Sequence, residues 1–233
     1  VIANKPAVLS NGAWVLPFWR EPGRTCPVLR TRQDQIDQVN SSAGVLVTED
    51  QGMTWVISGK LTQPQTWLIE NSVVELHGHS LMQLFRTKLG ALAISFSYDG
   101  GLSWSIPQHS DIPNPDSKVH LLRLGGQAWQ VGGSAGGSLE GALVLAYNRS
   151  PRYRSPLVIS VSQDEGRTWR MLADVEPDPE VQYAYPTMVD AGDALHVAYA
   201  VMHPDPAYKL LSQGIKMASI RKEPIGPSPG LWK

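Results

Sequence analysis

One short motif occurs three times along the chain and constrains its fold more than any other feature. Each copy reads [ST]-x-D-x-G-x-[ST]-W, and the copies span residues 48–55, 97–104 and 162–169. This composition is typical of a β-turn, because the Asp carboxylate accepts hydrogen bonds from turn amides and Gly tolerates a positive φ. The Trp then leads the returning strand. Three copies in the same register predict a repeated hairpin.

The segments between the motifs alternate or run apolar, as β-strands do. In the first three repeats two such segments flank a glycine turn, and a third leads into the Asp-containing motif. A fourth repeat has a glycine turn and a third strand-like segment but no motif. The turn glycines are Gly12, Gly78, Gly125 and Gly192. Four-stranded units repeated in this way are typical of a β-propeller. We therefore predict an all-β fold in which residues 1–222 form about four blades, the last incomplete, followed by a Pro-rich C-terminal tail at residues 223–233.

The charge balance argues against some functional classes. The chain has 20 Lys and Arg against 21 Asp and Glu, for a net charge of −1, so we expect no nucleic-acid surface. No apolar run approaches the roughly 18 residues of a membrane span. Cys26 is the only cysteine, which rules out an internal disulfide and a thiolate metal cage. His77 and His79 flank a turn glycine, but a metal site needs a further ligand. We expect no metal and no cofactor.

The three motifs match the Asp-box of the sialidase (neuraminidase) superfamily. Further segments resemble the family in the family's order: Trp67-Leu68-Ile69-Glu70, Phe85-Arg86-Thr87, Ala146-Tyr147-Asn148, Arg154-Ser155-Pro156-Leu157 and Ala184-Tyr185-Pro186. The resemblance covers nearly the whole chain. It implies a six-bladed β-propeller, of which this chain supplies about four blades, and we expect the other two to lie before Val1.

The resemblance also implies an activity, the retaining exo-hydrolysis of a terminal sialic acid or related 2-keto-3-deoxy acid sugar. The carboxylate beside the anomeric carbon repels an anionic nucleophile, and a neutral tyrosine avoids this if a carboxylate takes its proton. Such enzymes are an exception to the usual two-carboxylate scheme of glycosidases. The resemblance makes Tyr185 the nucleophile and Glu70 its general base. We expect them to face each other across the central channel.

The resemblance further makes Arg86 and Arg154 two of the three arginines that bind the substrate carboxylate, a role suited to the bidentate guanidinium. Arg149 and Arg152 are alternatives to Arg154, which we prefer because Arg-x-x-Leu leads directly into a strand, as in the family. The expected partner is an acidic sugar or glycoconjugate.

Two family groups, the third arginine and the general-acid aspartate, belong to motifs that this sequence does not contain. We therefore expect this chain alone to have no efficient activity. Asp-boxes also occur in receptors and non-catalytic propellers, which leaves a glycan- or protein-binding propeller as an alternative. A propeller enzyme with other chemistry on acidic polysaccharides, such as a lyase, is a third possibility.

Overall fold

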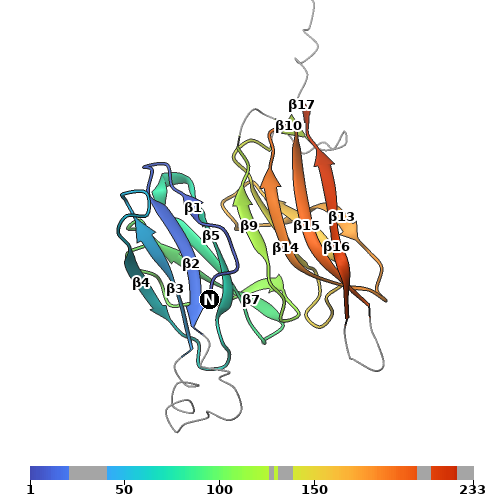
Figure 1. Cartoon of the computed structure of the whole chain (residues 1–233), viewed down its shortest axis with the longest axis horizontal. Helices are drawn as coiled ribbons and strands as arrows, with labels where there is room; N and C mark the ends of the chain where they lie inside the picture. The colour runs from blue at the N-terminus through green and yellow to red at the C-terminus, as the bar shows by residue number, and fades with distance from the viewer. Residues whose placement is uncertain (21–40, 126–128, 131–138, 204–210, 225–233) are drawn as a thin grey trace, which may run out of the picture.

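The strands of the chain form four successive antiparallel sheets, which Figure 1 shows in order from blue to red. The computed structural model describes residues 1–20, 41–125, 129–130, 139–203 and 211–224. The first sheet consists of β1 (Ala7–Val8), β2 (Trp14–Arg20), β3 (Ser42–Thr48) and β4 (Val56–Leu61). The second consists of β5 (Ile69–Glu75), β6 (Leu81–Arg86), β7 (Ala91–Ser97) and β8 (Gln108–Pro113). The third consists of β9 (His120–Arg123), β11 (Leu143–Asn148), β12 (Leu157–Ser162) and β13 (Arg170–Glu176).

The fourth sheet has three strands within the described residues. They are β14 (Gln182–Asp190), β15 (Ala194–His203) and β16 (Leu211–Arg221). A separate pair joins β10 (Trp129–Gln130) to β17 (Glu223–Pro224). The segment predicted as a C-terminal tail therefore begins with a paired strand, and residues 225–233 lie outside the described part of the chain. None of the helical segments among the described residues is long and apolar enough to span a membrane.

These sheets confirm the all-β propeller prediction. In each sheet the strands pair in chain order as an up-and-down meander, which is the architecture of a propeller blade. Hydrophobic clusters fill the spaces between adjacent blades. Strands β11 and β12 are buried at every position, because both of their faces contact neighbouring blades. This explains their continuous apolar sequences, whereas the outer strands β4 and β13 carry more exposed residues.

The first strands of the four blades converge on a common channel. A cavity of about 310 Å³ is lined by residues from all four blades, including Lys5, Ser72, His120 and Met188. Each first strand starts at one end of the sheets and runs to its hairpin turn at the other. The Asp-box turns, which join the third strand to the fourth, lie at the hairpin end. The motif that predicts the fold is therefore remote from the starts of the first strands.

Each Asp-box is closed by its own side chains. In the third copy, Asp164 Oδ1 accepts the backbone N–H of Thr168 at 2.8 Å, and Oδ2 accepts its hydroxyl at 2.6 Å. The hydroxyl of Ser162 also donates to Asp164, and the Trp169 indole covers the turn by donating to the Gly166 carbonyl. The first and second copies repeat this pattern. Hydrogen bonds from Thr168, and then from Ser162, lower the pKa of Asp164 to about 2.

Asp164→Asn is expected to lower the melting temperature at neutral pH and to weaken its dependence on acid. A carboxyl with a lowered folded-state pKa stabilises the fold above its unfolded pKa of 3.8, and this stabilisation is lost as the pH falls to about 2. Thermal unfolding followed by circular dichroism between pH 2 and 7 measures both effects. Asp111→Asn, at an exposed position of β8, is the matched control. If the melting temperatures of both variants depend on pH in the same way, the Asp164 carboxylate does not stabilise the fold as its lowered pKa predicts.

Candidate active site

Glu70 and Tyr185 occupy equivalent and unusual positions in the second and fourth blades. Each lies in a first strand, six residues before the residue that closes the first hairpin, which is Leu76 or Ala191. The pairing register with the second strand shifts at both places, which is the mark of a β-bulge. The φ angle is +48° at Glu70 and +55° at Tyr185. Such a conformation costs a non-glycine residue of order 1–3 kcal/mol, and strain of this kind concentrates at functional sites.

The side chain of Asn4 holds the backbone at Glu70. Its Nδ2 donates to the carbonyl oxygens of Glu70 at 3.2 Å, Asn71 at 3.0 Å and Val119 at 3.2 Å. Asn4 is buried just before β1, so one amide ties together the inner segments of the first three blades. This contact fixes the start of β5, where the bulge at Glu70 lies.

Arg86 ends β6 and links two carboxylates. Its Nη1 donates to Glu70 Oε2 at 2.7 Å, and its Nε donates to Asp116 Oδ1 at 2.7 Å. The side chains of Arg86 and Glu70 are 12% and 9% exposed, whereas that of Asp116 is 35% exposed. Burial lowers the pKa of Arg86, but the hydrogen bonds and charges of Asp116 and Glu70 outweigh it and raise the pKa above its ordinary value. The guanidinium is therefore a fixed cation.

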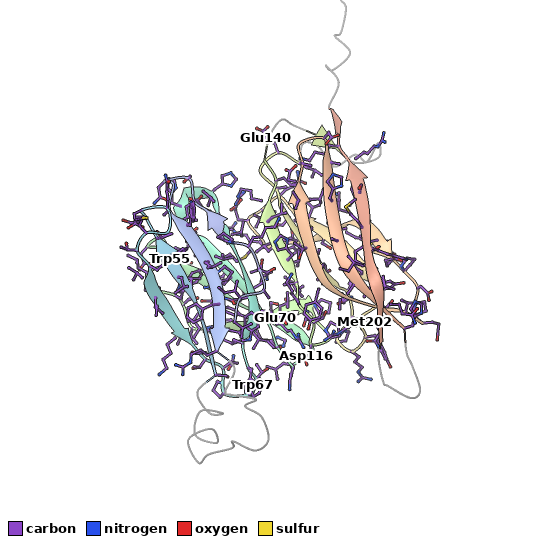
Figure 2. All side chains as sticks on the ribbon, in the orientation of Figure 1. Trp55, Trp67, Glu70, Asp116, Glu140 and Met202 are labelled. Atoms are coloured by element: carbon purple, nitrogen blue, oxygen red, sulfur yellow. The ribbon has the colours of Figure 1, made fainter. Side chains whose placement is uncertain are left out.

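Asp116 joins this ion pair to Arg154, in the loop between β11 and β12 of the third blade. Its carbonyl oxygen accepts a hydrogen bond from Arg154 Nη2 at 2.9 Å. The Arg154 guanidinium carbon lies 6.0 Å from the centre of the Tyr185 ring, within the range of a cation–π contact. In Figure 2, Glu70 and Asp116 lie beside each other at the end of the sheets opposite Glu140. Tyr185 is 47% exposed, so a solute can reach it.

The four residues selected from the sequence thus lie in one network, which Asp116 completes. The order of contacts is Glu70, Arg86, Asp116, Arg154 and Tyr185. Within the described part of the chain, no direct hydrogen bond joins the Tyr185 hydroxyl to the Glu70 carboxylate. Tyr185 lies in the middle of β14 rather than at its start, because the three residues before it pair with β15.

The alternatives to Arg154 lie differently. Arg149 and Arg152 are exposed, whereas Arg154 is half-buried in the network. Asp116 is absent from the sequence-based selection. It has a φ of +55° and lies in the segment that leads into β9, as Glu70 does at the start of β5. The position six residues before the first hairpin of the third blade falls in the same segment, so comparison of the blades at this position would have identified it.

The described residues contain no group of three or more His, Cys, Asp or Glu side chains that could hold a metal ion. The two histidines considered in the sequence lie at the hairpin end of the second blade. His77 Nδ1 is 2.6 Å from Glu165, in the Asp-box of the third blade. His79 Nδ1 is 2.9 Å from the Ser10 hydroxyl in the first blade and 3.2 Å from Glu75. Both histidines therefore contact neighbours at the end remote from Tyr185.

Comparison with known proteins places this chain in a family. The family model of the BNR repeat-like domain matches residues 1–197. A curated sialidase of Paraclostridium sordellii is 30% identical over 107 residues, which are 45% of this chain and 23% of that protein. Among solved structures, the NanB sialidase of Streptococcus pneumoniae superposes with a TM-score of 0.66 at 19% identity, over 92% of this chain and 30% of that one. The intramolecular trans-sialidase of Ruminococcus gnavus gives a TM-score of 0.58 at 16% identity, over 94% and 42%. The chain spans less than half the length of these relatives.

Proposed function

The chain belongs to the sialidase superfamily of BNR repeat-like propellers, and from this premise we propose that it carries the nucleophile side of a retaining sialidase site. The proposed reaction is the hydrolysis of a terminal sialic acid or a related 2-keto-3-deoxy acid sugar. The observation that supports it most is the network from Glu70 to Tyr185, which contains two guanidiniums and begins and ends at strained bulges.

In the proposed first step, the Tyr185 oxygen attacks the anomeric carbon while Glu70 accepts the phenolic proton. The bond to the leaving group breaks, and a glycosyl-tyrosine forms. Water then attacks the same carbon and the phenol leaves, so the anomeric configuration is retained. Glu70 is held by Arg86 in the absence of substrate. Catalytic hydrogen bonds often form only in the substrate complex, so the missing contact to Tyr185 does not argue against the pair.

The substrate carboxylate would bind between Arg86 and Arg154, because their planar guanidiniums can donate paired hydrogen bonds. Arg154 is the more available of the two, since within the described residues its guanidinium donates to a single backbone carbonyl. Arg86 already serves two carboxylates. The N–H groups of Arg86 that do not bind these carboxylates would donate to the substrate carboxylate.

Because this chain alone is expected to lack efficient activity, the direct test uses the full-length protein. Its hydrolysis of an aryl glycoside of N-acetylneuraminic acid is followed by NMR as the product forms. A sialidase releases the sugar first in the α configuration of the substrate. Release of the β anomer would contradict the tyrosine mechanism. Binding of the sugar without any product would support the alternative of a glycan-binding propeller, and an unsaturated product would indicate a lyase.

Asp116→Asn is expected to tighten binding of free N-acetylneuraminic acid roughly 3- to 10-fold at low salt. The amide oxygen can still accept the hydrogen bond from Arg86 Nε, but one negative charge beside the two arginines is lost. Isothermal titration at low and high salt measures the effect, which should shrink as salt increases. Asp111→Asn, at an exposed position of the outer strand β8, is the control for the loss of one negative charge. Equal affinity in the two variants would show that Asp116 does not face the bound sugar.

A further inference from the structure

The third blade carries a lysine at the position that Glu70 and Tyr185 occupy in their blades. Lys118 lies six residues before Leu124, which closes the first hairpin of that blade. Lys118 is only 3% exposed. No sequence motif marks Lys118, because it lies in a loop before the short strand β9.

The ammonium group of Lys118 is bound to the bulge that carries Tyr185. Its Nζ donates to the carbonyl oxygen of Pro186 at 2.6 Å, and the Thr187 hydroxyl lies 3.4 Å away. Among the described residues, no carboxylate lies within salt-bridge distance of Lys118. A buried ammonium without a direct counter-ion is unfavourable, so its presence at this point indicates a role beyond stability.

The charges that face Lys118 come from three other elements. Glu70 in β5 attracts its charge, and Lys5, before β1, repels it. His120 in β9 is kept neutral because burial, and then Lys118 and Lys5, lower its pKa to about 3. His120 Nδ1 accepts the backbone N–H of Met188 at 3.0 Å, so the segment at β9 contacts the Tyr185 strand twice.

Burial also lowers the pKa of Lys118 to about 8, despite the attraction of Glu70. Lys118 is then mainly charged at neutral pH and loses its proton in mildly basic buffer. A neutral amine is a weaker donor than an ammonium, so the contact with the Pro186 carbonyl weakens over the same interval.

We propose that Lys118 is a positioning residue for the nucleophile, whose ammonium holds the Pro186 carbonyl and thereby the bulge that presents Tyr185 to the site. The expected effect on catalysis rests on the proposed function. The structural part, a coupling between the charge of Lys118 and the placement of the Tyr185 ring, can be tested without any turnover.

The structural test is an NMR titration of the chain labelled with ¹³C at the tyrosine ε positions, with Tyr185 assigned by Tyr185→Phe. The Tyr185 signal should move with a midpoint near pH 8 in the unmodified protein. It should not show this step in Lys118→Arg, whose guanidinium stays charged. Tyr98, exposed at the Asp-box end, is the internal control. A Tyr185 signal without this step in the unmodified protein, or with the same step in Lys118→Arg, would overturn the inference.

The catalytic test compares Lys118→Met and Lys118→Arg with the unmodified full-length protein on the aryl glycoside. Lys118→Met should lower kcat roughly 10- to 100-fold with KM changed less than about 3-fold, as expected for a misplaced reacting group. Lys118→Arg should recover most of the loss and keep its activity above pH 8. Equal kcat in all three proteins would refute the positioning role. Absence of turnover in every protein would instead count against the proposed function, and the titration would still decide the inference.

Discussion

In the full-length protein, Tyr185→Phe is expected to lower kcat on an aryl glycoside of N-acetylneuraminic acid by at least roughly 10³-fold, since the variant lacks the attacking oxygen. The phenyl ring and its contact with the Arg154 guanidinium remain, so KM should change by only a few-fold. The fold should be unaffected, because the ring is half-exposed and its hydroxyl has no hydrogen bond within the described residues. Steady-state kinetics together with a thermal unfolding curve separate the two effects.

Tyr153→Phe provides the matched control for this experiment. Tyr153 is exposed and precedes Arg154, so the same hydroxyl is lost beside the site rather than in it. Its kcat should stay within about 3-fold of that of the unmodified protein, as is usual for surface changes. Comparable kcat values for the two phenylalanine variants would remove Tyr185 from the mechanism.

Arg86→Met is expected to lower the free energy of unfolding by about 3 kcal/mol at pH 7. The change leaves the Glu70 carboxylate, which is 9% exposed, without its ion-pair partner, and it deprives Asp116 of its contact with Arg86. Breaking one side of a buried ion pair is among the costlier single substitutions, because the remaining charge stays out of water. Urea unfolding at equilibrium measures the loss.

The control for the arginine experiment is Arg154→Met. Arg154 is less buried and loses one hydrogen bond to a carbonyl, so its effect on unfolding should be about 1 kcal/mol or less. The double variant Glu70→Gln, Arg86→Met should recover part of the loss, because the neutral amide needs no counter-charge. If the loss of stability in the double variant equals the sum of the losses in Glu70→Gln alone and Arg86→Met alone, the Arg86–Glu70 pair does not stabilise the fold.

The blades could be predicted from the sequence because their signals are local. The Asp-box closes through residues at most four positions apart, as the contacts of Asp164 with Thr168 show. The apolar runs of β11 and β12 follow directly from burial on both faces. Turn chemistry and strand pattern therefore gave the number and order of the blades within the described chain.

Only those site residues that lie in segments resembling the family could be predicted from the sequence. Asp116 contacts Arg154 across 38 positions of sequence, and Lys118 contacts Pro186 across 68, so no local pattern marks either residue. The bulges were also not foreseen, since neither Glu nor Tyr commonly adopts a positive φ. The Asp-boxes, the strongest signal in the sequence, lie at the end of the blades remote from these residues.

The most direct test of the central claim is to identify the residue labelled by a 3-fluorinated N-acetylneuraminyl fluoride. Fluorine beside the reacting carbon slows the second step, and a fluoride leaving group needs little protonation, so the reagent reports on the nucleophile alone. Mass spectrometry of the digested protein should find one sugar adduct, on Tyr185, and none in Tyr185→Phe. An adduct on any other residue, or unaltered protein after prolonged exposure to saturating reagent, would contradict the assignment of Tyr185 as the nucleophile.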